Sequence, residues 1–442
     1  MIYLLPLTIS LILGLLIIKT ALNNKVPGAL LTFFLSGIIG LGSSAILTFS
    51  SFVIFNQLSA VWVIALHLGI ITALGWYLKQ KNQLCSLPLL KTLTWQDGAA
   101  FTILAAICIP TIIHASLYPY GGWDAWGTWN MKARFLFLGG TSWSNMFDPM
   151  LWRDQINYPF LLPLMHVWLW CFGSAPTPLV PLIMTCLITF LSAGVLFGIL
   201  KEITGKFYMV LIPACLFTNL AVAIQASSQY SDLLVATFLL TALGLFALFN
   251  LTKNAGYLIL MGATLGMMGF TKAEGMGLLA ITGIASSILI MTTFKDICKN
   301  ALIKLWSATI AAAIPLLLFV FIYAPRKVVV FKNGLTAPDH PLTWDRFSYF
   351  MSFMGHDLIN NRWQGLWILP VIALMVAGRK SLNQTVRLFP VVLLANICFS
   401  LSMFYINTHY DIVWWMNTSF ERVALDILPA LFCWATLALF QE

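Results

Sequence analysis

The sequence has very little charge. Of its 442 residues, 9% are Asp, Glu, Lys or Arg, whereas hydrophobic residues make up 60%. A soluble globular domain usually carries about 25% charged residues. This shortage, with a mean hydropathy of +0.89, excludes an ordinary soluble protein and predicts an all-α polytopic membrane protein.

Motifs for nucleotide and metal chemistry are also missing. The sequence has no Walker loop, GxGxxG or HExxH, so an ATP- or nicotinamide-driven mechanism has no support. The eight cysteines are scattered, without a CxxC pair or zinc-like Cys/His spacing, which is typical of buried free thiols. The formal net charge is +9, but most Lys and Arg fall in short loops between apolar runs, where they set topology. We therefore expect no cofactor, no metal site and no nucleic-acid partner.

Apolar runs of about 20 residues, the length that crosses a bilayer as helix, predict about thirteen transmembrane helices. The runs cover residues 2–18, 29–49, 58–78, 99–117, 179–200, 207–224, 233–251, two stretches within 257–291, 305–323, 366–377, 388–406 and 423–440. The N-terminal run lacks a basic start and a small-residue cleavage site, so we expect a retained span rather than a signal peptide. The shorter, Trp-rich run 159–172 is expected to lie along the membrane interface.

The spans divide the chain into N-terminal transmembrane helices (residues 1–98) and a core (residues 99–442). Two long polar loops, residues 118–158 and 324–364, belong to the core. With the loop between the third and fourth spans in the cytoplasm, most basic residues fall on that side and most acidic residues on the other. This predicts an integral membrane protein, with its two long loops outside and its C-terminus inside.

The first long loop contains the best candidate for catalysis. Asp124 lies in a Gly-Gly-Trp-Asp-Ala-Trp-Gly segment, directly after a predicted span. A carboxylate in that place meets water and is flanked by aromatic rings that can stack on a sugar, which suits a general base for an acceptor hydroxyl. The alternative is an interfacial aspartate that caps a following helix.

Further charged residues occur at the predicted outer ends of spans. Lys132 and Arg134 share helical spacing near the interface, where cations bind lipid phosphates or extend their charged ends toward water. Asp232 ends a Tyr-Ser-Asp segment, and Lys272 and Glu274 share one polar turn. Ionisable groups near a membrane are costly and usually face a cavity or a partner. Lys272 could neutralise a phosphate, and Glu274 could either act in the site or only pair with Lys272.

Arg422 directly precedes the last predicted span. A guanidinium at that depth suits a phosphate or carboxylate, or a salt bridge to Glu421 or Asp426. The second long loop mixes both charges, for which solvated loop charge is the default interpretation. Its possible divalent-metal ligands have no diagnostic spacing: His340, Asp345, His356 and Asp357.

The order of these segments resembles the GT-C superfamily of membrane glycosyltransferases, in particular the bacterial protein O-mannosyltransferase and aminoarabinose transferase branch. The resemblance covers roughly residues 99–440. It depends on the first-loop carboxylate, a Tyr-Pro-Phe–Leu-Leu-Pro-Leu segment, a Gly-Ser break, a Tyr-x-Asp, a Thr-Lys-x-Glu-Gly turn and a Ser-x-x-Arg. It implies a GT-C-like helix bundle that moves a sugar from a polyprenyl-phosphate donor to a glycan, lipid or protein acceptor outside the cytoplasm.

The resemblance also implies roles for single residues. Asp124 matches the base or acceptor-orienting position, Lys272 and Arg422 match basic positions near the carrier phosphate, and the role of Asp232 stays open. The expected substrate-binding set is Lys132, Arg134, Tyr158, Asp232, Lys272, Glu274 and Arg422. Two other interpretations remain: a polysaccharide polymerase or ligase that uses lipid-linked glycans, and a secondary transporter.

Overall fold

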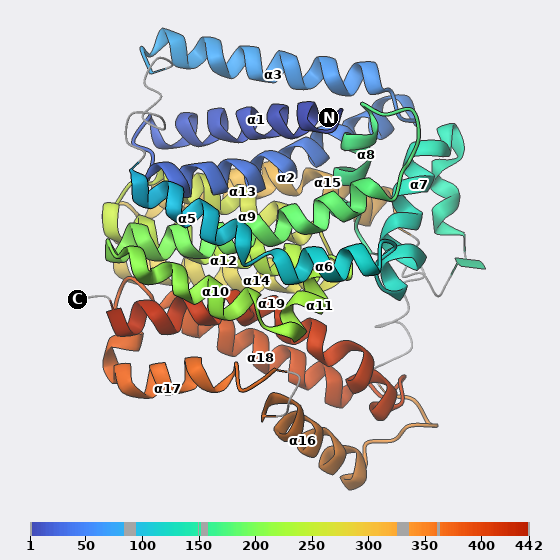
Figure 1. The fold of residues 1–442 in the computed structure, drawn as a ribbon, viewed down its shortest axis with the longest axis vertical. Helices are drawn as coiled ribbons and strands as arrows, with labels where there is room; N and C mark the ends of the chain where they lie inside the picture. Colours follow the sequence, from blue (N-terminus) through green and yellow to red (C-terminus); the bar gives the residue numbers. More distant parts are fainter. Residues whose placement is uncertain are drawn as a thin grey trace.

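In the computed structural model the chain forms a bundle of helices whose axes run in similar directions (Figure 1). The structure describes residues 2–83, 94–148, 150–151, 158–324, 336–359 and 363–440. Within these ranges every regular element is a helix, which confirms the predicted all-helical fold.

The helices follow one another along the chain. The first half of the chain forms α1 (Leu4–Leu22), α2 (Ala29–Phe55), α3 (Ala60–Gln80), α5 (Trp95–Ala106), α6 (Ile109–Leu117), η1 (Ala125–Trp129), α7 (Asn130–Leu138), α8 (Leu161–Trp170), α9 (Leu179–Thr204), α10 (Leu211–Phe217) and α11 (Leu220–Ser227). The second half forms α12 (Asp232–Thr252), α13 (Gly256–Gly269), α14 (Ala273–Thr293), α15 (Cys298–Leu318), η5 (Phe319–Tyr323), α16 (Trp344–Ile359), α17 (Ile368–Ala377), α18 (Leu388–Ile406) and α19 (Ile412–Phe440).

Ten helical segments of the described chain are long and apolar enough to cross a bilayer, the architecture of a polytopic membrane protein. Three of the thirteen predicted spans do not reach that length as straight helices. The run 207–224 is bent by 74° at the start of α11. The other two are the 14-residue α13 and the 10-residue α17.

The bend before α11 has a local cause. Asn219 accepts hydrogen bonds from the backbone amides of Ala221 and Val222 through its side-chain oxygen. This caps a new helix, because asparagine satisfies the free N–H groups of a first turn. One apolar run therefore forms two helices at an angle, a broken span or a re-entrant segment, instead of one straight helix.

Helix α12 is the centre of the bundle. Every residue in its apolar window is buried, and it packs against α9, α13 and α19. A helix that is hydrophobic on all sides has no solvent or lipid face to present, so burial in protein is the expected outcome. Asp232 is the first residue of this helix, which places one carboxylate at the end of the most enclosed element of the fold.

The N-terminal helices join the same core. A side chain at Gly14 in α1 would collide with the backbone of α2, and one at Gly40 in α2 would collide with the backbone of α1. Beside this contact the hydroxyls of Ser10 and Ser44 lie 2.8 Å apart. Small residues let membrane helices approach closely, and α2 in turn packs on α8 and α9. The hydrophobic core is therefore continuous across residue 98.

Helix α8 differs from the expected surface helix. All ten residues from Leu161 to Trp170 are buried, and α8 packs against α2, α7 and α9. Its tryptophans pack inside the protein instead of facing lipid headgroups; Trp168, for example, donates a hydrogen bond to Ser10. The expectation of a helix lying along the interface is corrected here, because protein covers every side of it.

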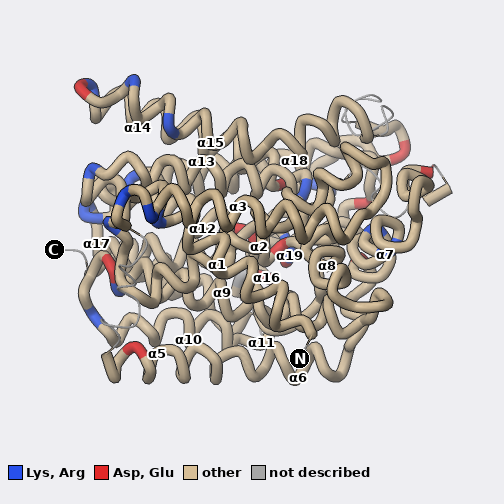
Figure 2. The backbone as a smooth tube through the Cα atoms, turned by 90° about the horizontal axis from the view of Figure 1, so that it is seen from above, with Lys and Arg blue, Asp and Glu red and all other residues tan. Residues whose placement is uncertain are grey.

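Charges separate along the bundle. Figure 2 shows Lys and Arg gathered at the end where the C-terminus lies, with acidic residues at that end and at the other. The basic group lies at the ends of α1, α3, α9, α12 and α17 and at the start of α15, and includes Lys19, Lys79, Lys201, Lys253, Lys299 and Arg379. Helix α19 begins at Ile412, so Arg422 lies within the last long helix instead of preceding it.

Candidate active site

Five of the predicted site residues form one continuous chain of ion pairs. Arg422 Nη1 lies 2.6 Å from Asp124 Oδ2, and Arg422 Nε lies 3.3 Å from Asp232 Oδ2. Lys272 Nζ lies 2.7 Å from Asp232 Oδ1 and 3.1 Å from Glu274 Oε1. We call this set, Asp124, Asp232, Lys272, Glu274 and Arg422, the ion cluster. Its two cations alternate with three carboxylates, so it has one formal negative charge in excess.

Four separate segments bring the cluster together. Asp124 directly precedes η1, Asp232 begins α12, Lys272 is the residue before α14, and Arg422 lies in α19. Asp232 gains from its position, because the N-terminal end of a helix attracts negative charge. The side chains of Asp232 and Lys272 are each 3% exposed, whereas Asp124 is 24% exposed. The cluster is therefore closed at its α12 end and open to solvent at Asp124.

Two glycines fix the backbone before Asp124. Gly121 has a φ of +71°, in the left-handed region that favours glycine, and the amide of Gly122 donates to the carbonyl of Ser228. A side chain at Gly122 would collide with the hydroxyl of Tyr230. The Gly-Gly pair thus lets the first loop lie directly against the segment that leads into α12.

Tyr230 packs on the most open ion pair. The guanidinium carbon of Arg422 lies 4.5 Å from the centre of the Tyr230 ring, a cation–π distance. Burial raises the pKa of Tyr230, against the opposing effect of Arg422. Tyr230 therefore stays a neutral phenol, and its ring packs against the guanidinium of Arg422.

Tyr158 and Lys132 border the cluster. Lys132 is fully buried and donates to the backbone carbonyl of Tyr158 at 2.9 Å. The nitrogens of Lys132 and Lys272 lie 5.9 and 6.0 Å from the centre of the Tyr158 ring, and Trp129 stacks on that ring. Burial, together with the charge of Glu274, raises the pKa of Tyr158. This neutral ring forms an aromatic wall between two cations.

The charge state of Lys272 follows from its neighbours. Burial alone lowers the pKa of a lysine, but the carboxylates of Asp232 and Glu274 raise it further than burial lowers it. The pKa of Lys272 therefore lies above its usual value, and the ammonium stays charged. A stable cation in a largely water-free place suits an anionic ligand such as phosphate.

The structure decides several alternatives that the sequence left open. Asp124 makes no capping hydrogen bond; its carboxylate pairs with Arg422. Arg422 pairs with Asp124 and Asp232, while Glu421 accepts a hydrogen bond from Gln225. The side chain of Lys132 is buried and does not extend toward water.

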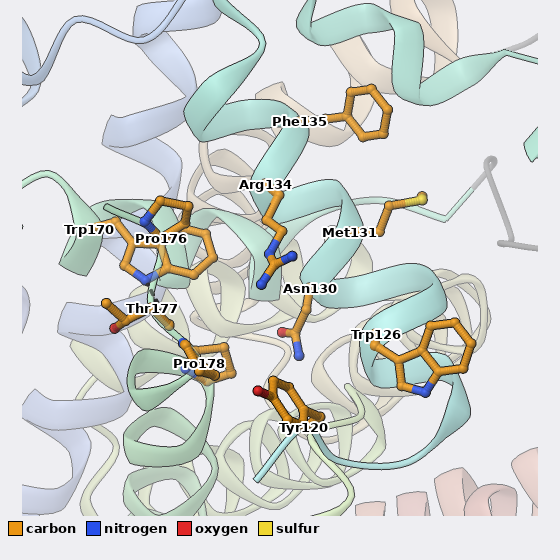
Figure 3. A pocket seen from close by; sticks show the side chains of 11 residues that line it. Tyr120, Trp126, Asn130, Met131, Arg134, Phe135, Trp170, Pro176, Thr177 and Pro178 are labelled. Atoms are coloured by element: carbon orange, nitrogen blue, oxygen red, sulfur yellow. Dashed lines mark hydrogen bonds between the residues drawn. The ribbon is translucent and has the colours of Figure 1, made fainter. Parts of the chain in front are cut away.

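Arg134 is the one expected site residue that lies apart from this group. It is exposed on α7 and lines a groove that contains none of the ion-cluster residues. Figure 3 shows its side chain extending into the space beside Asn130 and Trp170. Lys132 and Arg134 lie on one helix, as predicted. The turn of α7, however, directs the two cations to different sites.

Parts of both long loops lie outside the described residues. These are Arg153 and Asp154 in the first loop, and Arg326, Lys327, Lys332 and Arg362 in the second. Among the residues that are described, no three metal-ligating side chains come together, so His340, Asp345, His356 and Asp357 form no such group.

Asp426 is a member of the site that sequence reasoning named only as a salt-bridge partner. It lies one turn beyond Arg422 in α19, is 1% exposed, and is near enough to interact electrostatically with both cations of the cluster. Its Oδ1 has no hydrogen-bond partner within the described part of the chain. A carboxyl in an apolar span was a detectable signal, because such groups are costly and usually functional.

The arrangement places a carboxylate that could act as a base (Asp124), two cations (Lys272 and Arg422) and the Tyr158 ring around one point that is partly open to solvent. The ion pair with Arg422 is made through Oδ2 of Asp124, so the other oxygen of that carboxylate can face a ligand. Comparison with known proteins finds no match: no family model, no curated protein and no solved structure is similar to the chain at a significant level.

Proposed function

We propose that the protein is an integral membrane glycosyltransferase that moves a sugar from a polyprenyl-phosphate donor to an extracytoplasmic acceptor. The observation that supports this most is the ion cluster, in which the partly exposed carboxylate of Asp124 meets two cations. Asp124, Asp232 and Arg422 come from distant parts of the sequence. Such a cluster is costly to bury and would be retained for a task.

The proposed chemistry needs few groups. Asp124 takes the proton of the acceptor hydroxyl, whose oxygen forms the new bond to the anomeric carbon. The bond between that carbon and the phosphate oxygen breaks, and its electron pair stays on the phosphate. Lys272 and Arg422 stabilise the growing negative charge of the leaving phosphate. The donor brings its own activation, so no nucleotide is required.

In the resting structure the cations are already occupied by carboxylates, and this suggests an exchange. The phosphate of the donor would replace Asp124 on the guanidinium of Arg422, whose planar fork suits either oxyanion. Asp124 would then be released as a base at the moment when the donor is in place. Asp232, with its two buried ion pairs, would hold the cations during the exchange.

The proposed location follows from charge. The loops at the C-terminal end of the bundle are rich in Lys and Arg (Figure 2), which favours the cytoplasm for that end. The ion cluster would then face the other side of a bacterial plasma membrane, where a polyprenyl carrier presents its sugar.

The test is sugar transfer by the purified full-length protein in detergent, with a panel of radiolabelled polyprenyl-phosphate sugars. Label should leave the carrier with wild-type protein and not with Asp124→Asn. Asp148→Asn is the matched control, because Asp148 is an exposed carboxylate of the same loop, and among the described residues only the amide of Met150 donates to it. Transfer by Asp124→Asn at the wild-type rate would remove Asp124 from the chemistry.

A secondary transporter is the second candidate, and one observation favours it. Asp426 is a buried carboxyl with an unpartnered oxygen inside a long apolar helix, as in proton-coupled carriers. A transporter would accumulate its substrate unchanged in proteoliposomes, whereas a transferase, polymerase or ligase would form a new glycosidic product. Product analysis of one reaction therefore separates the two.

A further inference from the structure

A groove of about 370 Å³ lies on the exposed side of α7, away from the ion cluster. Its walls come from the first loop, from α7 and from the segment between the end of α8 and the start of α9 (Figure 3). The lining residues are Tyr120, Trp126, Asn130, Met131, Arg134, Phe135, Trp170, Pro176, Thr177, Pro178 and Pro181. Its size falls in the range of about 300–1,000 Å³ that small-molecule sites occupy.

The described residues that line the groove carry positive charge and no negative charge. Among the described residues that line it, Arg134 is the only charged one, and none is a carboxylate. Arg134 makes no hydrogen bond or ion pair with the described part of the chain, and its side chain extends into the groove (Figure 3). This contrasts with the ion cluster, whose cations are both paired. As far as the structure describes it, the groove therefore presents positive charge to a ligand without an internal competitor.

Asn130, a polar residue of the groove, has a side-chain oxygen without a hydrogen-bond partner among the described residues. Asn130 donates to the side-chain oxygen of Gln229 at 2.9 Å, but its own Oδ1 is buried and accepts no hydrogen bond from the described residues. Leaving a buried acceptor unsatisfied costs free energy. A hydroxyl or N–H of a ligand would satisfy this oxygen once the amide group of Asn130 turns toward the groove.

The groove walls are rigid and aromatic. Trp170 is fixed by a hydrogen bond from its Nε1 to the carbonyl of Thr177, and three prolines restrict the segment beside it. Trp126 and Tyr120 remain about half exposed, at 50% and 61%. Large exposed rings beside a cation are suited to covering the organic part of a ligand.

We propose that this groove is a second binding site, for a phosphate ester at the membrane surface. Arg134 binds the phosphate oxygens, Asn130 accepts from a hydroxyl of the ligand, and Trp126 covers the organic part. A phosphorylated sugar and a phospholipid headgroup share this chemistry. The inference does not depend on glycosyl transfer, because no residue of the ion cluster lines the groove.

The test is calorimetric titration of the full-length protein in an uncharged, phosphate-free detergent solution. The probes are glucose 1-phosphate, short-chain phosphatidylglycerol, inorganic phosphate and, as the neutral control, glucose. The variants are Arg134→Gln, Arg134→Lys and Trp126→Ala. Arg379→Gln is the matched control, because it removes one exposed guanidinium from the opposite, basic end. Arg422→Gln separates this site from the ion cluster.

We expect wild-type protein to bind at least one of the two phosphate esters, and Arg134→Gln to weaken that binding about tenfold or more. Arg134→Lys should lose less, and Arg379→Gln should keep the wild-type affinity. Arg422→Gln should retain the binding step that Arg134→Gln removes, whatever it does to binding at the ion cluster. Trp126→Ala should weaken the esters more than inorganic phosphate. Whether glucose 1-phosphate or phosphatidylglycerol binds more tightly identifies the source of the phosphate.

Equal affinity of wild type and Arg134→Gln for both esters would overturn the proposal, as would no binding of either ester to folded wild-type protein. Loss of ester binding in Arg422→Gln alone would also overturn it, by assigning the phosphate site to the ion cluster. None of these outcomes decides whether the protein transfers sugars, so this inference and the proposed function can fail separately.

Discussion

The guanidinium of Arg422 lies 2.6 Å from the carboxylate of Asp124, a residue 298 positions earlier in the chain. The same guanidinium reaches Asp232 through Nε. One planar side chain therefore joins the partly exposed carboxylate of Asp124 in the first loop to the buried carboxylate of Asp232 in α12. A point-like ammonium cannot hold two carboxylates in this forked geometry.

The first prediction is that Arg422→Lys does not preserve activity. The lysine keeps the charge but loses one of the two ion pairs, so the leaving phosphate loses a positioned donor. We expect sugar transfer to fall about 100-fold or more. The measurement is initial transfer rate against Arg379→Lys as control, and an unchanged rate would show that charge alone is sufficient at this position.

The second prediction separates binding from chemistry in Asp124→Asn. If the carrier phosphate and Asp124 compete for Arg422, removing the negative charge should tighten the binding of a polyprenyl phosphate while transfer is lost. The Asp124 carboxylate is partly exposed, so we expect a modest effect of about fivefold. The measurement is equilibrium binding of polyprenyl phosphate without sugar. Weaker binding by the variant would mean that Asp124 holds Arg422 in place for the phosphate.

The third prediction compares two buried carboxyls. Asp232→Asn leaves Lys272 and Arg422 without their shared partner, and removing one member of a buried ion pair costs about 3–5 kcal/mol. Within the described part of the chain Asp426 has no ion pair and its Oδ1 accepts no hydrogen bond, so for Asp426→Asn we expect a change of less than about 1 kcal/mol. Unfolding in mixed micelles measures both, and equal losses would contradict the difference in pairing.

The fourth prediction concerns pH. The pKa of Lys272 is raised by Asp232 and Glu274 despite burial, so its stabilising contribution is fully present below the ordinary lysine pKa. That contribution is lost only when the pH rises through the higher pKa of the folded state. The stability difference between wild type and Lys272→Met should therefore be constant from about pH 6 to 9. A difference that shrinks within this range would show that the ammonium deprotonates there.

Much of the fold follows from apolar run length alone. A bilayer requires about 20 apolar residues per helix, and ten of the predicted runs correspond to long apolar helices or helix pairs. The run at 207–224 is not one straight helix, because Asn219 caps a new helix inside it. The start of α19 was placed too late because Arg422 ends the apolar run, whereas two carboxylates compensate its charge and the helix extends back to Ile412.

The sequence singled out five charged residues that the structure brings together, but not their geometry. Asp232, Lys272 and Glu274 were selected by the cost of charge near a membrane, Asp124 by its place among aromatic residues after a span, and Arg422 by its depth before the last span. No sequence pattern, however, states which carboxylate meets which cation across four segments. For the same reason the groove beside Arg134 was not foreseen, because its walls come from three segments that only the fold brings together.

The last prediction tests the glycine that lets the first loop approach α12. A methyl group at Gly122 would collide with the hydroxyl and ring of Tyr230, which packs on Arg422. The ring of Tyr230 is packed against Arg422. Gly122→Ala should therefore displace the ring or the loop and cost about 1–3 kcal/mol of stability. Transfer should fall with it, because Asp124 is two residues away. Gly98→Ala is the control, since nothing lies within 4 Å of the added methyl group. Wild-type stability and transfer in Gly122→Ala would show that the loop does not depend on this close contact.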